Sequence, residues 1–86
     1  MRSVEFHPRA LDDLSFWIRA DKRTALRILG LIQACLADPF RGIGKPEPLK
    51  AELRGLWSRR ITAEHRLVYR ISDDRISVIQ CRYHYD

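Results

Sequence analysis

The sequence of 86 residues lacks several features that would place it in a common protein class. It has only two cysteines, Cys35 and Cys81, no run of the roughly 20 apolar residues that cross a bilayer, and no apolar signal-peptide core after Met1. The lone cysteines predict reduced core residues, with a cysteine nucleophile as the minor alternative. We therefore expect a cytosolic protein that does not contact membranes, and a single domain over residues 1–86, because so short a chain supports one thin core.

Signatures of bound metals and nucleotides are missing as well. The His, Cys, Asp and Glu residues show no metal-ligand spacing, no glycine-rich loop ends in Gly-Lys-Ser/Thr, and no serine sits in a nucleophile elbow. We expect neither a metal nor another cofactor.

Positive charge is what the sequence has in excess. Sixteen Lys and Arg residues against 11 Asp and Glu give a formal net charge of +5. Residues 1–38 are nearly balanced, so the excess comes from Arg41, Lys45, Lys50, Arg54, Arg59, Arg60, Arg66, Arg70, Arg75 and Arg82. This distribution predicts one basic face and a polyanionic partner.

Hydrophobic periodicity predicts an α+β fold in the order β-α-α-β-β-β. The expected strands cover residues 3–6, 57–62, 65–72 and 75–83, and the expected helices cover residues 9–20 and 24–37. Residues 40–48 hold two glycines and two prolines and are expected to form a stiff loop. Two helices would then pack on one face of a small, mainly antiparallel sheet, leaving the other face free for a ligand.

One carboxylate in the expected loop has an unusual setting. Glu47 stands between Pro46 and Pro48 and is flanked by Lys45 and Lys50. Prolines fix φ, and a stiffly held carboxylate near cations suits a general base. A solvated loop glutamate explains the motif about equally well.

Arginines are concentrated in the expected strands that follow, with Arg59, Arg60 and Arg66 on neighbouring strands. The guanidinium fork binds phosphate through two hydrogen bonds, so these residues are candidate phosphate ligands. The alternative is a salt-bridged surface with Glu47, Glu52 and Glu64, which is the better interpretation for any single arginine.

The last residues place one imidazole between two phenols, with His84 between Tyr83 and Tyr85. Histidine can protonate a leaving alkoxide near neutral pH, and tyrosine can stack on a base or bind a phosphate. The alternative for His84 is a frayed terminal residue. For the other histidines, His7 and His65, structural roles are expected.

Four segments in this order and spacing resemble the YoeB/Txe toxins of type II toxin–antitoxin systems, which belong to the RelE-like superfamily. They are KPEPLK at 45–50, GLWSRRIT at 55–62, EHRLVY at 64–69 and CRYHY at 81–85. The resemblance implies an endoribonuclease that cuts messenger RNA in the ribosomal A site, inhibits translation and is neutralised by a cognate antitoxin. It implies messenger RNA, the ribosome and that antitoxin as partners, and a homodimer as the assembly.

The resemblance also assigns roles to residues. The family's catalytic Glu falls on Glu47, its phosphate-binding Arg on Arg66, its catalytic His on His84 and its C-terminal Tyr on Tyr85. Lys50 and Arg60, with Arg59 and Lys45, are the expected phosphate ligands around them. Asp86 departs from the pattern and adds a negative charge after the tyrosine.

Two expectations follow for the mechanism. Without a metal, Glu47 would take the 2′-hydroxyl proton, Arg66 would stabilise the phosphorane and His84 would protonate the 5′-oxygen, leaving a 2′,3′-cyclic phosphate. Strict alternation from a two-residue turn at 73–74, however, puts His84 on the face toward the helices. A β-bulge or release of the last residues from the sheet must therefore bring His84 to the side of Arg66.

Two other functions remain open at this point. The chain would be a non-catalytic binding module if its arginine-rich sheet merely held RNA or an acidic protein. It would poison DNA gyrase if it followed the ParE branch of the superfamily, although the intact Glu-Arg-His-Tyr set argues against that. Mutation combined with an activity assay separates these functions.

Overall fold

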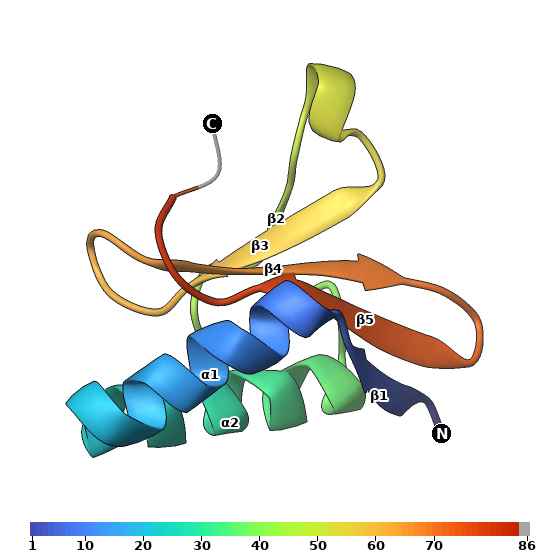
Figure 1. The fold of residues 1–86 in the computed structure, drawn as a ribbon. Coiled ribbons are helices and arrows are strands. Elements are labelled where there is room, and N and C mark those ends of the chain that lie inside the picture. The colour runs from blue at the N-terminus through green and yellow to red at the C-terminus, as the bar shows by residue number, and fades with distance from the viewer. Residues whose placement is uncertain (85–86) are drawn as a thin grey trace.

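The computed structural model describes residues 1–84 and arranges them as a pair of helices against one face of a five-stranded sheet (Figure 1). In chain order the elements are β1 (Ser3–Phe6), α1 (Pro8–Ala20), α2 (Lys22–Ala37), β2 (Glu47–Pro48), the 3₁₀ turn η1 (Ala51–Leu53), β3 (Leu56–Arg60), β4 (Arg66–Ile71) and β5 (Arg75–Gln80). The strand order is β1-β5-β4-β3-β2, with β1 parallel to β5 and the other pairs antiparallel. The predicted α+β fold is confirmed.

The core lies between the helices and one face of the sheet. Ile28, Leu31 and Cys35 follow the helical period of α2 and are fully buried with Leu67 of β4 and Val78 of β5. Each fully buried aliphatic side chain contributes about 1.5–3 kcal/mol. The sheet is therefore fixed in place by its helix-facing side, and its other face carries polar residues together with the buried Leu56 and Val68.

Helix α2 begins two residues earlier than the periodicity predicts because of its N-cap. The carboxylate of Asp21 accepts hydrogen bonds from the backbone N–H groups of Arg23 and Thr24, which have no partner inside the helix. The helix ends at Ala37, since the residue before Pro39 avoids the helical region of backbone space.

The predicted loop over residues 40–48 is wrong at its end. Glu47 and Pro48 pair with Ser58 and Trp57 and form β2, a two-residue strand at the edge of the sheet. An edge position tolerates Pro48, since its missing N–H removes no bond from the interior of the sheet. The strand predicted over residues 3–6 has the predicted bounds, and the other three predicted strands exist but end before their predicted last residues.

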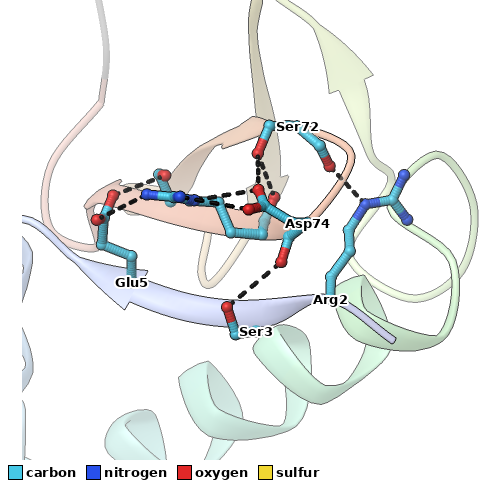
Figure 2. Close-up of polar contacts among 7 residues, drawn as sticks. Arg2, Ser3, Glu5, Ser72 and Asp74 are labelled. Atoms are coloured by element: carbon cyan, nitrogen blue, oxygen red, sulfur yellow. Dashed lines mark hydrogen bonds and ion pairs between the residues drawn. The ribbon is translucent and has the colours of Figure 1, made fainter.

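A polar cluster joins β1 to the turn between β4 and β5 (Figure 2). Arg2 donates to the carbonyl oxygen of Ser72 at 2.7 Å, and Arg75 forms ion pairs with Glu5 and Asp74 at 3.3 and 3.2 Å. These contacts tie the first strand to the last one, which is the single parallel pairing in the described sheet.

The carboxyl of Asp74 makes this cluster sensitive to pH. Hydrogen bonds from Arg75 and Ser72 lower the pKa of Asp74 below its ordinary 3.8. A carboxylate with a lowered folded-state pKa stabilises the protein above the unfolded pKa, and this contribution is lost as pH falls through the folded one. We expect Asp74→Asn to lower the urea midpoint at neutral pH but to have little effect at strongly acidic pH. Asp73→Asn in the same turn is the control, and an equal cost of Asp74→Asn at both pH values would contradict this explanation.

Within residues 1–84, none of the helices combines the length and the apolar character needed to cross a membrane.

Candidate active site

Glu47, Arg60 and Arg66, three residues of the predicted site, lie on the face of the sheet opposite the helices. The strand register aligns Glu47 of β2 with Ser58 of β3, and Ser58 with Val68 of β4. Residues directly opposite one another project from the same face. Arg60 lies two residues after Ser58 and pairs with Arg66, which lies two residues before Val68. Side chains two residues apart on a strand share a face, so both arginines lie on the face that carries Glu47.

The central contact of this site is an ion pair between Arg66 and Glu47. Nη1 of Arg66 lies 3.2 Å from Oε1 of Glu47, which is both an ion pair and a hydrogen bond. The Glu47 side chain is 57% exposed and that of Arg66 only 18%, so the carboxylate is open to a ligand while the arginine is held by its surroundings. Two residues 19 positions apart in sequence are thus joined into one unit.

The loop that leads to Glu47 is fixed by Arg59, which corrects one prediction. Arg59 is fully buried, and its guanidinium donates to the carbonyl oxygens of Asp38, Arg41 and Ile43 at 2.6–3.0 Å and to Oη of Tyr69 at 3.2 Å. Every nitrogen of the guanidinium is therefore engaged inside the protein. The prediction that Arg59 binds phosphate is wrong for this structure, because the group is inaccessible.

Gly44 brings the same loop into close contact with β3. Its carbonyl oxygen accepts the backbone N–H of Arg60 at 2.6 Å, and its φ of 83° lies in the left-handed region. A Cβ at this position would lie 2.8 Å from Leu31 and 3.1 Å from Arg59. Only glycine combines this backbone geometry with this approach, and Glu47 follows three residues later.

The chain after β5 turns onto the face that carries Arg66. Val68 pairs with Gln80 and Tyr69 with Val78, which leaves Ile79 as the extra residue of a β-bulge. Gln80 then faces the Arg66 side, and its amide donates toward the carbonyl oxygens of Arg82 and His84 at 3.1 and 3.5 Å. Figure 1 shows the segment rising on the side away from the helices.

The bulge and the end of β5 at Gln80 together determine the side of the sheet on which the last described residue lies. Strict alternation predicts His84 on the helix side, but the extra residue shifts the alternation, and Cys81 instead lies in the helix-facing core. His84 is exposed, and its backbone lies over the face of Arg66. The structure has both routes expected from the sequence: the bulge at Ile79, and the release of residues 81–84 from the sheet, since β5 ends at Gln80. Tyr85 lies outside the described residues.

The other predicted phosphate ligands are exposed cations near the site. Lys45 and Lys50 flank Glu47 in sequence, and Lys50 directly precedes η1. Arg60 is exposed beside Arg66. Exposed cations therefore lie within three residues of Glu47 in the chain and directly opposite Arg66 in the sheet.

Both cysteines and His65 take structural positions. Burial raises the pKa of the Cys35 thiol and raises that of Cys81 to about 12, which disfavours the nucleophilic thiolate. His65 accepts the backbone N–H of Tyr83 at 2.8 Å, while His7 occupies the N-cap position of α1. The structural role expected for His65 agrees with its position, whereas the His7 side chain is exposed and makes no capping hydrogen bond, so its role stays a prediction.

The described part of the chain has a hollow on α1, away from the predicted site residues, and no metal-binding group. A hollow of about 460 Å³ on α1 is lined by Asp12, Ser15, Phe16, Arg19 and Ala20, and it contains none of the predicted site residues. Residues 1–84 contain no group of three His, Cys, Asp or Glu side chains placed to hold a metal ion.

Several known proteins are similar to this chain over nearly its whole length. The model of the family described as "YoeB-like toxin of bacterial type II toxin-antitoxin system" matches residues 6–85. Toxin YoeB of Mycobacterium bovis is 59% identical over 85 residues, which cover 99% of this chain and 100% of that protein. The YoeB dimer from Staphylococcus aureus superposes with a TM-score of 0.91 at 40% identity, covering 98% of both chains. The toxin in the YoeB-YefM complex of the same organism gives a TM-score of 0.89 at 38% identity, covering 99% of both. The chain therefore belongs to the family of YoeB-like toxins of bacterial type II toxin–antitoxin systems.

Proposed function

We propose that this toxin is an endoribonuclease that cleaves messenger RNA in the ribosomal A site and so inhibits translation. The observation that carries the proposal is the contact between Glu47 and Arg66 on the exposed face of the sheet. A half-exposed carboxylate beside a guanidinium supplies a proton acceptor next to a phosphate ligand, which is what attack by a 2′-hydroxyl requires.

Each residue of the site has one role in this reaction. Glu47 takes the proton of the 2′-hydroxyl, whose oxygen attacks the adjacent phosphorus. Arg66 stabilises the charge of the phosphorane, an effect worth on the order of 3–4 kcal/mol for one well-placed donor. His84, as imidazolium, protonates the departing 5′-oxygen, and Tyr85 assists at the phosphate or the base. The products are a 2′,3′-cyclic phosphate and a 5′-hydroxyl.

The ion pair does not prevent Arg66 from binding substrate. A guanidinium carries five N–H donors, and Glu47 occupies one of its terminal nitrogens at 3.2 Å. The remaining donors are sufficient for a phosphate at the same time. Lys45, Lys50 and Arg60 extend this positive surface along the RNA, and Arg59 has no part in it.

Protein partners follow from the solved relatives. The Staphylococcus aureus toxin forms a complex with YefM and is also seen as a dimer. We propose a cognate antitoxin for this chain, which binds and neutralises it, and a homodimer as the form without antitoxin.

The direct test incubates the purified toxin with ribosomes that are translating a defined message and maps the RNA ends that appear. We expect new 5′-hydroxyl ends within the codon that occupies the A site. The matched control is Glu47→Gln, which keeps the size of the side chain and should give almost no new ends. RNA binding without new ends would favour a non-catalytic module, and gyrase-dependent breaks in DNA would favour a ParE-like toxin. Either result would refute the proposal.

A further inference from the structure

The segment after β5 makes a turn that needs outside support. Tyr83 has a φ of 68°, in the left-handed region that costs a residue with a side chain on the order of 1 kcal/mol or more. Tyr83 as a whole residue is 51% exposed, so burial contributes little to holding the turn. The Tyr83 ring contacts the His65 ring at 5.8 Å and the Arg82 guanidinium at 4.6 Å between centres. The two backbone polar groups of Tyr83 are held by His65, which precedes β4, and by Arg66, the first residue of β4.

The side chain of His65 and the backbone of Arg66 each form a hydrogen bond with the backbone of this turn. Nδ1 of His65 accepts the N–H of Tyr83 at 2.8 Å, and the N–H of Arg66 donates to the carbonyl oxygen of Tyr83 at 3.1 Å. Because a backbone N–H can only donate, Nδ1 must be unprotonated, and the proton of the neutral ring lies on Nε2. The segment that carries His84 is thus fastened to the residue that carries the phosphate-binding guanidinium.

The ring of His65 is itself held in one orientation. Trp17 packs edge-on against it, with the ring centroids 4.8 Å apart, and the indole N–H of Trp17 donates to the carbonyl oxygen of Cys81 at 2.8 Å. The helix therefore fixes both the beginning of the segment and the imidazole that holds its turn. A packed ring with a defined hydrogen bond keeps its acceptor at a constant position.

We propose that His65 is a positioning residue, which sets the distance between His84 and Arg66 through the amide of Tyr83. This inference rests on the proposed function, in which those two residues act on the same phosphate. His65 itself does not contact the substrate. Since Trp17, Gln80 and Arg66 hold the segment at other atoms, losing the acceptor on His65 loosens the turn without detaching it.

Two substitutions separate the hydrogen bond from the packing. His65→Phe keeps an aromatic ring against Trp17 but has no acceptor. His65→Asn loses the ring but carries an oxygen one bond beyond Cγ, where Nδ1 stands. If the His65→Phe variant does not fold, His65→Gln is used in its place. The side-chain oxygen of glutamine lies one bond farther from the backbone than Nδ1 of histidine, so it does not reach the Tyr83 amide in the same geometry. His7→Phe, at an exposed histidine, is the matched control.

The experiment measures the hydrogen exchange of the Tyr83 amide and the kinetics of RNA cleavage for each variant. For His65→Phe we expect about tenfold faster amide exchange and at least about a tenfold fall in kcat with KM nearly unchanged. His65→Asn should keep both quantities within about threefold of the parent. The inference would be overturned by an unchanged kcat in His65→Phe, or by equal falls in kcat in His65→Phe and His65→Asn. If His84→Ala retained full activity, the proposed function itself would fail, whatever the amide exchange showed.

Discussion

Replacing Glu47 by glutamine or His84 by alanine is expected to lower the rate of RNA cleavage by about 10²–10⁴-fold, with little change in RNA affinity. Each substitution removes one proton transfer, while the cations that bind the phosphates stay in place. Single-turnover cleavage of a ribosome-bound message gives the rate, and a separate titration with RNA gives the affinity. Cleavage rates within a few-fold of the parent would show that these residues do not carry the proton transfers.

The folded state should tolerate both changes. Glu47 is more than half exposed, and an ion pair at such a position contributes about 0–1 kcal/mol. His84 is exposed at the end of the described chain. The matched controls are Glu64→Gln in the exposed turn before β4 and His7→Ala, and both should cleave like the parent protein.

Replacing Arg59 by alanine is expected to destabilise the protein by about 3–5 kcal/mol. The substitution leaves the carbonyl oxygens of Asp38, Arg41 and Ile43 and the hydroxyl of Tyr69 without their buried donor. Each buried acceptor left unsatisfied costs about 1–3 kcal/mol, and the missing side chain also leaves a cavity. For a chain of this size the loss lowers Tm by on the order of 15 °C or more.

The neighbouring arginine supplies the control for this measurement. Arg60→Ala alters an exposed side chain on the opposite face and should change Tm little while weakening RNA binding. Thermal unfolding followed by circular dichroism compares the two variants. Equal shifts in Tm for Arg59→Ala and Arg60→Ala would contradict the structural role of Arg59.

Periodicity in the sequence predicted the helices and most of the sheet, because burying an apolar face imposes a repeat on the residues. The same reasoning applied to β3 would have placed Arg59 correctly. It alternates with Arg60, so only one of the two can face away from the helices. Counting both as phosphate ligands ignored this alternation.

Other features could not be read from the residues alone. The bulge at Ile79 arises from how β5 pairs with β4, and nothing in the local sequence marks the extra residue. Strand β2 has only two residues and includes a proline, so it carries no alternation to detect. The ion pair between Glu47 and Arg66 depends on the pairing of β2 with β3 and of β3 with β4, which is why the sequence predicted the members of the site but not their contact.

The most direct test of the central claim uses a message in which sulfur replaces the 5′-bridging oxygen at the cleavage site. A thiolate leaves without protonation, so the substrate bypasses the general acid but still needs the general base. We predict that this message restores cleavage by His84→Ala to nearly the parent rate and leaves Glu47→Gln inactive. Failure to rescue His84→Ala, or rescue of Glu47→Gln instead, would contradict the assignment of the acid to His84 and the base to Glu47.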